Sequence, residues 1–320
     1  TGANNVALGF ESLKNNTTGA SNTAVGKDAL FTNTTGCQNV AVGTCSLNAN
    51  TDAFKNVAVG FEAGKDNTTA DNLTAIGFQA AQNNTTGGGN TGVGSAVLNT
   101  NTTGASNTAI GSGALYANTT ASDNTAVGAS ALDTNTTGAS NTAVGKNALT
   151  ANTTACDNTA MGCGALAANT TGDFNTAVGF TALTANTTAD NNTAIGHMSL
   201  KTNTGAGHHN TAVGSFALNS NTTAADNVAI GVNAMYANTT GASNVAVGAE
   251  ALDANTTGAE NTAVGRFALT SNTTGDENTA IGRYSLGTNT TGEKNTALGH
   301  STVENNTTGD FNVGIGHGAL

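Results

Sequence analysis

Hydrophobic and polar residues alternate along this chain in a pattern that keeps a 17-residue period from one end to the other. The repeat is clearest in Asn22-Thr23-Ala24-Val25-Gly26, and we number repeat positions 1 to 17 from Asn22. Position 5 is glycine in all 19 copies, and the only irregular step is the one from Gly196 to Gly214, which contains a single extra residue. A fixed period of this kind predicts a stack of equivalent coils.

Positions 2 to 4 have the composition of a β-strand. Position 2 is Thr or Val, position 4 is Val, Ile, Leu or Met, and position 3 is Ala in every copy except Gly92 and Gly314. Because side chains alternate across a strand, one face carries branched residues and the other carries small ones. We therefore expect parallel strands that are covered on both faces, with the small residues against a second chain or a very tight coil interior.

The next segment of the repeat predicts a corner and a core residue. The position-5 glycine is expected to end the strand at a corner with positive φ or close backbone approach, as at Gly26, Gly43, Gly60, Gly145 and Gly265. Position 9 is Leu in 15 copies and is replaced only at Gly64, Ala81, Met235 and Val303. We expect this leucine to fill the coil interior, as at Leu30, Leu149 and Leu269.

A second corner or short strand is predicted where the sequence reads Asn-Thr. Positions 12 and 13 are Asn-Thr in all 18 copies that reach them, and position 15 is always Gly or Ala. Stacked asparagines can form amide ladders, and asparagine tolerates left-handed backbone at turns. We assign this structural role to the position-12 asparagines, represented by Asn33, Asn152 and Asn272.

These patterns predict an all-β chain, a parallel β-solenoid or β-roll of about 19 coils, each coil being one 17-residue repeat. We expect left-handed winding and a single repeat domain over residues 1–320. Both ends of the sequence cut through a coil, which suggests a segment of a longer fibre protein.

The distribution of residue types over the repeat positions indicates which positions lie inside the coil and which lie on its surface. The chain has 13 aromatic and 29 charged residues and neither Pro nor Trp, and a stack that donates nearly every backbone N–H has little place for proline. All the aromatic residues, and all the charged residues except Asp52, fall at positions 6, 7, 10, 11, 16 and 17. We expect these six positions to face outward.

Charge and motif content bear on the classes of function. A net charge of −11 argues against a nucleic-acid partner, and the absence of a run of 18 apolar residues argues against membrane insertion of this segment. No nucleophile, base and orienting group recur together, and the acidic residues recur too irregularly for a calcium-loaded solenoid. We expect no enzyme, no catalytic or metal-binding residues and no cofactor.

The motif Asn141-Thr142-Ala143-Val144-Gly145 resembles the Ser-Val-Ala-Ile-Gly core of the head repeats in trimeric autotransporter adhesins, which are left-handed β-rolls of three chains side by side. With Ala148-Leu149 and the following Asn-Thr-Thr, the longer unit resembles the 17-residue repeats of bacterial tail-fibre-like proteins. The resemblance covers the whole chain. It implies an extracellular, cell-surface or virion fibre, shaft or adhesin that self-associates as a trimer or filament.

Asn-Thr-Thr is also an acceptor pattern for N-linked glycans. It is intact in 16 of the 18 copies, and possible glycan acceptors include Asn16, Asn33, Asn118, Asn152, Asn238 and Asn306. We favour a structural ladder, because the asparagine is kept where the acceptor pattern fails, at Asn50 and Asn203. Sugars on threonine are a further alternative.

A binding solenoid for ice or carbohydrate is the alternative function. Columns of threonine at the coil spacing could order water, but Val replaces Thr at position 2 in six copies, for example Val228 and Val245, which favours burial. A host-surface or glycan partner would be recognised by the variable outward columns, for example by Phe61 and Phe78, which should stack on adjacent coils.

Cysteines and basic residues complete the candidates. Two cysteine pairs, Cys37 with Cys45 and Cys156 with Cys163, flank single strands, and the partners are too far apart for a bridge, so free thiols and interchain bridges are both open. Basic residues gather near the inserted residue and at position 6 of the last coils, at His197, His208, His209, Arg266, Arg283, His300 and His317. A metal site or an anion stripe is conceivable there, and we favour a solvated edge that faces nearby acids such as Glu260 and Asp276.

Overall fold

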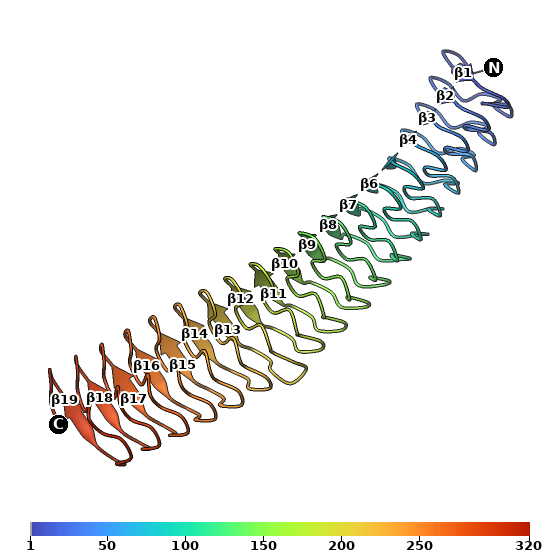
Figure 1. Cartoon of the computed structure of the whole chain (residues 1–320). Helices are drawn as coiled ribbons and strands as arrows, with labels where there is room; N and C mark the ends of the chain where they lie inside the picture. Colours follow the sequence, from blue (N-terminus) through green and yellow to red (C-terminus); the bar gives the residue numbers. More distant parts are fainter. Residues whose placement is uncertain (1) are drawn as a thin grey trace. The chain divides into compact units, whose positions relative to one another are not determined.

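The computed structural model describes residues 2–320 in two units, residues 2–158 and 159–320, and each unit is a parallel β-solenoid (Figure 1). Each 17-residue coil contributes one strand of three residues. The first unit contains β1 Val6–Leu8, β2 Thr23–Val25, β3 Val40–Val42, β4 Val57–Val59, β5 Thr74–Ile76, β6 Thr91–Val93, β7 Thr108–Ile110, β8 Thr125–Val127 and β9 Thr142–Val144.

The second unit repeats the arrangement, including the coil with the inserted residue. Its strands are β10 Thr159–Met161, β11 Thr176–Val178, β12 Thr193–Ile195, β13 Thr211–Val213, β14 Val228–Ile230, β15 Val245–Val247, β16 Thr262–Val264, β17 Thr279–Ile281, β18 Thr296–Leu298 and β19 Val313–Ile315.

Successive strands within each unit pair in parallel and in register. Thr108 lies beside Thr125 and Ile110 beside Val127, so each repeat position stacks on the same position of the next coil. The predicted parallel solenoid with its 17-residue period is confirmed. Left-handed winding and a single domain over residues 1–320 stay predictions. The Asn-Thr corner is a bend and not a strand among residues 2–320, so each coil has one strand only.

The interior of the coil is filled by small residues, leucine and asparagine. Leu30, Leu149 and Leu269 are completely buried, and so are the position-3 alanines such as Ala109 and Ala229. Burying a leucine side chain contributes about 2 kcal/mol, and one such residue recurs in most coils. The narrow interior accounts for the small side chains at position 3 and in most copies of position 8, such as Ala29 and Ala148.

The turn that follows each strand depends on backbone conformations with positive φ. Gly60 has φ 142°, and a Cβ there would lie 2.2 Å from the carbonyl oxygen of Gly77, so the next coil leaves no room for a side chain. Positions 7, 9 and 17 are also left-handed but are mostly not glycine, as at Asp28 (φ 56°), Leu30 (φ 50°) and Ser21 (φ 57°). Each coil therefore combines one obligatory glycine with three left-handed residues.

Candidate functional site

The most regular surface in either unit is formed by the outward side chains of the strands. We call the side chains at repeat positions 2 and 4 the outer strand face. The alanine between them points inward and is fully buried, whereas Ile110 in the first unit is 42% exposed and Ile230 in the second is 40% exposed. Register pairing lines these residues up in columns, with Ile110 between Val93 and Val127.

The expectation that both faces of the strands are covered is wrong for the chain as described. Only the inner face is covered, and it is covered by the chain's own tight interior. The outer strand face carries the branched residues and stays half-exposed, as the burial of β7 and β14 shows. Val228 and Val245 at position 2 are therefore only partly buried within one chain, and their presence does not count against a hydrated threonine face.

Threonine hydroxyls on the outer strand face are unused by the fold. In the described residues, those of Thr108 and Thr125 make no hydrogen bond, and both side chains are half-exposed. The face thus offers one column rich in free hydroxyls and one column of aliphatic side chains, separated by a single residue along each strand. Such a surface can bind a second apolar face or an ordered layer of water.

The position-12 asparagines form a buried ladder. In the first unit the Asn118 Nδ2 donates to Asn101 Oδ1 at 2.7 Å and to the Ala121 carbonyl oxygen at 3.0 Å, and Asn118 Oδ1 accepts from Asn135 Nδ2 at 3.1 Å. A carboxamide carries both a donor and an acceptor, so the same residue can bridge coil to coil without limit.

This ladder bears directly on the glycan alternative. Asn33, Asn118, Asn152 and Asn238 are completely buried, and a sugar on Nδ2 would replace its hydrogen bonds in an interior without room for it. Asn16 and Asn306 are half-buried, and each belongs to the asparagine ladder of its own unit. The structure therefore favours the ladder over glycosylation of the folded chain.

The two threonines after each of these asparagines have different surroundings. The first donates its hydroxyl to the next coil, as Thr119 does to the Thr136 carbonyl oxygen at 3.1 Å. The second is exposed, as Thr120 and Thr137 are. Positions 13 and 14 thus add to the surface, which is wider than the six outward positions expected from charge and aromatic content.

Sequence reasoning missed a second ladder, formed by the asparagine that opens the strand motif. Asn124 Oδ1 accepts the backbone N–H of Asn141 at 2.9 Å, and Asn124 Nδ2 donates to the Gly138 carbonyl oxygen at 3.0 Å. The recurrence of asparagine at position 1 was the available signal. Its cause is tertiary, because the donor lies one coil away and the acceptor lies at position 15, near the end of the same coil.

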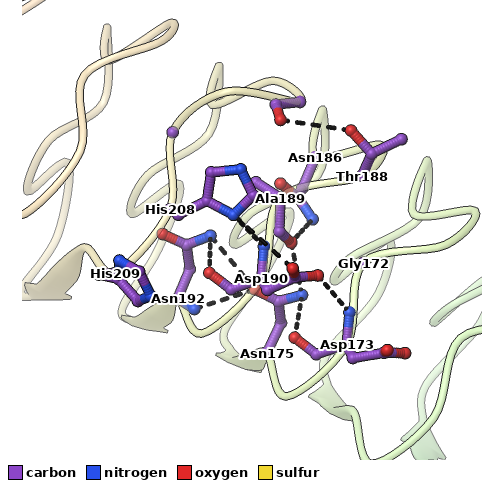
Figure 2. A network of polar contacts seen from close by, with 12 residues as sticks. Gly172, Asp173, Asn175, Asn186, Thr188, Ala189, Asp190, Asn192, His208 and His209 are labelled. Carbon is purple, nitrogen blue, oxygen red and sulfur yellow. Dashed lines mark hydrogen bonds and ion pairs between the residues drawn. The ribbon is translucent and has the colours of Figure 1, made fainter.

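His208, near the single-residue insertion, belongs to a polar network in the second unit (Figure 2). His208 Nδ1 accepts the backbone N–H of Asp190 at 3.0 Å, and the Asp190 carboxylate accepts the backbone N–H of Asp173 at 2.8 Å. His209 Nδ1 lies 3.4 Å from Asp226 Oδ1. His208 thereby takes the acceptor role that carboxylates play elsewhere at position 16, for example Asp276 toward the Ala259 N–H at 2.7 Å.

His197 does not join this network. Its ring stacks on Phe180, with 5.6 Å between centroids, and makes a T-shaped contact with Phe216, with 5.0 Å between centroids. The three histidines expected near the insertion are therefore divided between two surfaces. A metal site that needs all three is not formed, and among residues 2–320 no group of three or more His, Cys, Asp or Glu side chains could hold a metal ion.

Aromatic and basic side chains form stacks along the outward columns. Phe61 and Phe78 stack with 5.6 Å between centroids, as predicted for adjacent coils. The guanidinium of Arg266 lies 4.4 Å from the ring centroid of Phe267, and that of Arg283 lies 4.7 Å from Tyr284. The arginines thus rest on aromatic rings of their own coils. The expectation of a solvated edge that faces acidic residues did not include these ring contacts.

None of the four cysteines forms a disulfide among residues 2–320. Cys37 and Cys156 each accept a backbone N–H of the preceding coil, from Ala20 and Ala139 respectively, at 3.3 Å. This is again the acceptor role of position 16. No intrachain bridge forms, as the spacing predicted, and the choice between free thiols and interchain bridges stays open.

Residues 2–320 contain no helix of the length and apolarity needed to cross a membrane. No protein-family model matches the chain, and a search of curated proteins found no significant match.

Proposed function

We propose that this chain is a structural segment of an extracellular fibre, shaft or adhesin, and that its copies associate through the outer strand face into a trimer or filament. The observation that carries the proposal is the register-matched row of half-exposed aliphatic side chains on that face. Continuous apolar rows of this kind favour burial against a partner. A second copy presents the same periodic row at the same coil spacing, so it is the partner that fits.

The resemblance to adhesin heads and tail-fibre-like repeats supports the same proposal, because the adhesin heads place three β-rolls side by side. The proposal assigns the chain no catalytic role and no nucleic-acid partner. Buried leucines and hydrogen-bonded asparagines recur in nearly every coil, so the same interactions hold each coil to the next. Such a uniform stack is suited to a structural, load-carrying role.

The native mass of the purified chain tests the proposal. We expect a mass near three chain masses or a ladder of larger assemblies, compared with 31.2 kDa for one chain. Replacing Ile110 and Ile230 with Lys should reduce the assembly to monomers, because two charges would be buried in each interface.

Ser112→Lys with Val232→Lys is the matched control. These two residues lie at the exposed position 6, outside the strands, and add the same charge. We expect the control to assemble like the parent chain. A parent chain that stays monomeric at every concentration, or isoleucine variants that assemble as well as the control, would refute self-association through this face.

Ice binding is the second candidate, favoured by the free threonine hydroxyls on the outer strand face. It predicts a monomer that depresses the freezing point below the melting point, and Thr108→Tyr with Thr125→Tyr should remove this thermal hysteresis. An oligomer without hysteresis would contradict ice binding and agree with the fibre proposal.

A further inference from the structure

Side chains at repeat positions 7 and 10 lie next to one another on the surface, and we call this surface the 7/10 strip. The first unit has two coils that place a glutamate at position 7 and a lysine at position 10. Lys14 Nζ lies 2.6 Å from Glu11 Oε1, and Lys65 Nζ lies 3.1 Å from Glu62 Oε1. Lys14 Nζ also lies 5.4 Å from the ring centroid of Phe31, the position-10 residue of the next coil. The strip therefore accommodates an ammonium group between carboxylate and aromatic ring.

In the second unit the 7/10 strip contains a pocket without a lysine. Phe216, Asn233, Tyr236 and Asp253 line it. The Phe216 and Tyr236 rings meet edge to face with 6.3 Å between centroids. These four residues come from three consecutive coils, so the pocket depends on the stacking.

Asp253 is the unusual residue of this pocket. It occupies position 10, where Lys14 and Lys65 stand, and the position-7 residue of its own coil is again a glutamate, Glu250. Its Oδ1 is buried and has no hydrogen-bond partner. Burial, and then the negative charge of Glu250, raises the pKa of the Asp253 carboxyl above its usual range. This coil therefore has the position-7 glutamate of the Glu–Lys pairs, Glu250, but carries a second acid, Asp253, where those pairs have lysine.

We propose that this pocket binds an alkylammonium group, which would lie against the Asp253 carboxylate and the aromatic rings as the Lys14 ammonium lies against Glu11 and Phe31. An ammonium group compensates the negative charge of the Asp253 carboxylate, whose buried Oδ1 has no partner within the chain, and is attracted to the faces of aromatic rings. A sugar would offer hydroxyls to Asp253 and Asn233 but would leave the negative charge of the carboxylates uncompensated. The ligand class is therefore a cation with a short aliphatic stem.

Binding of n-butylammonium, followed by ligand-observed NMR at neutral pH, tests the proposal. We expect saturable binding, at least tenfold weaker binding to Asp253→Asn, and loss of binding to Asp253→Lys, because that lysine would supply the cation from within. Tyr236→Leu should weaken binding several-fold through loss of the ring.

Asp133→Asn and Tyr116→Leu are the matched controls. Asp133 and Tyr116 occupy position 10 in consecutive coils of the first unit, as Asp253 and Tyr236 do in the second, but the position-7 residue of the Asp133 coil is Ser130. We expect both controls to bind n-butylammonium like the parent chain. Thermal unfolding of every variant separates loss of the ligand from loss of the fold.

Two further ligands decide the chemistry and the source of the ammonium group. If n-butanol binds as tightly as n-butylammonium, or if Asp253→Asn binds like the parent chain while folded, the proposal is overturned. Nα-acetyl-lysine methylamide represents a lysine of a partner protein. Tighter binding of this compound than of n-butylammonium would identify a protein lysine as the ligand, and equal binding would identify a free amine.

Discussion

At the scale of single residues, each coil requires left-handed backbone conformations, which are unfavourable for most residues that carry a side chain. Position 7 is the clearest case, because the structure places glycine, asparagine and one β-branched residue in the same conformation. Gly164 has φ 66°, Asn233 φ 54° and Thr181 φ 48°. A β-branched residue is strained there. The Thr181 hydroxyl is also buried without a partner.

We expect Thr181→Gly to stabilise the chain by about 1 kcal/mol, because relief of the backbone strain and loss of the unpaired hydroxyl outweigh the entropy gained by the unfolded chain. Denaturant unfolding measures this change. Ser130→Gly, at the same repeat position with φ 53°, lacks the β-branch and should change stability less. Equal effects of the two substitutions would contradict the explanation from strain.

At the scale of the coil, residues that depart from the repeat compensate for one another in volume: a smaller residue at one core position accompanies a larger residue at another. The two glycines that replace the position-3 alanine accompany the only β-branched residues at position 8. A Cβ on Gly92 would lie 3.1 Å from Val97 Cγ1, and one on Gly314 would lie 2.5 Å from Val303 Cγ2 and 2.9 Å from Thr302 Cγ2. Gly64 replaces the usual leucine in a similar exchange: a Cβ there would lie 3.1 Å from Leu73 Cδ2. Leu73 stands at position 1 in place of asparagine.

A double-mutant cycle on Gly64 and Leu73 tests this compensation. Gly64→Leu alone should destabilise by about 2 kcal/mol through overpacking, and Leu73→Asn alone by about 2 to 4 kcal/mol through the cavity it leaves. Together they restore the usual residues, so we expect the double variant to lie within about 1 kcal/mol of the parent chain. Additive losses in denaturant unfolding would show that the two sites are independent.

At the scale of the whole chain, the coils are structurally equivalent, so one coil can take the place of another beside the same neighbour. The same asparagine ladders and strand pairs recur on both sides of the coil that contains β7. Removal of one full period should let Thr91 pair with Thr125 in unchanged register. The fold therefore depends on the period and not on the identity of each coil.

Deletion of residues 107–123, one full repeat, should leave a folded chain whose melting temperature falls by roughly 5 °C or less. Deletion of residues 107–114 is the control, since it brings different repeat positions into register and should unfold the neighbouring coils. Circular dichroism and thermal unfolding of both proteins measure the difference. Equal damage by the two deletions would mean that individual coils are not interchangeable.

The sequence alone determined the period, the parallel stack and the burial of the coil positions 3, 9 and 12. Glycine at position 5, leucine such as Leu149 at position 9 and asparagine at position 12 recur because a stack of equivalent coils meets the same steric and hydrogen-bonding demand at every level. Because the same requirement recurs over 19 copies of the repeat, the sequence alone reveals it.

Only the tertiary structure decided which strand face is open, because alternation divides a strand into two faces without saying which of them is inside. It also decided that Leu30 is left-handed, with φ 50°, because leucine has no preference for positive φ. The pocket around Asp253 depends on side chains that neighbour each other only across coils. Each of these features arises from contacts between residues about one period apart, where the repeat fixes the register and the individual side chains fix the chemistry.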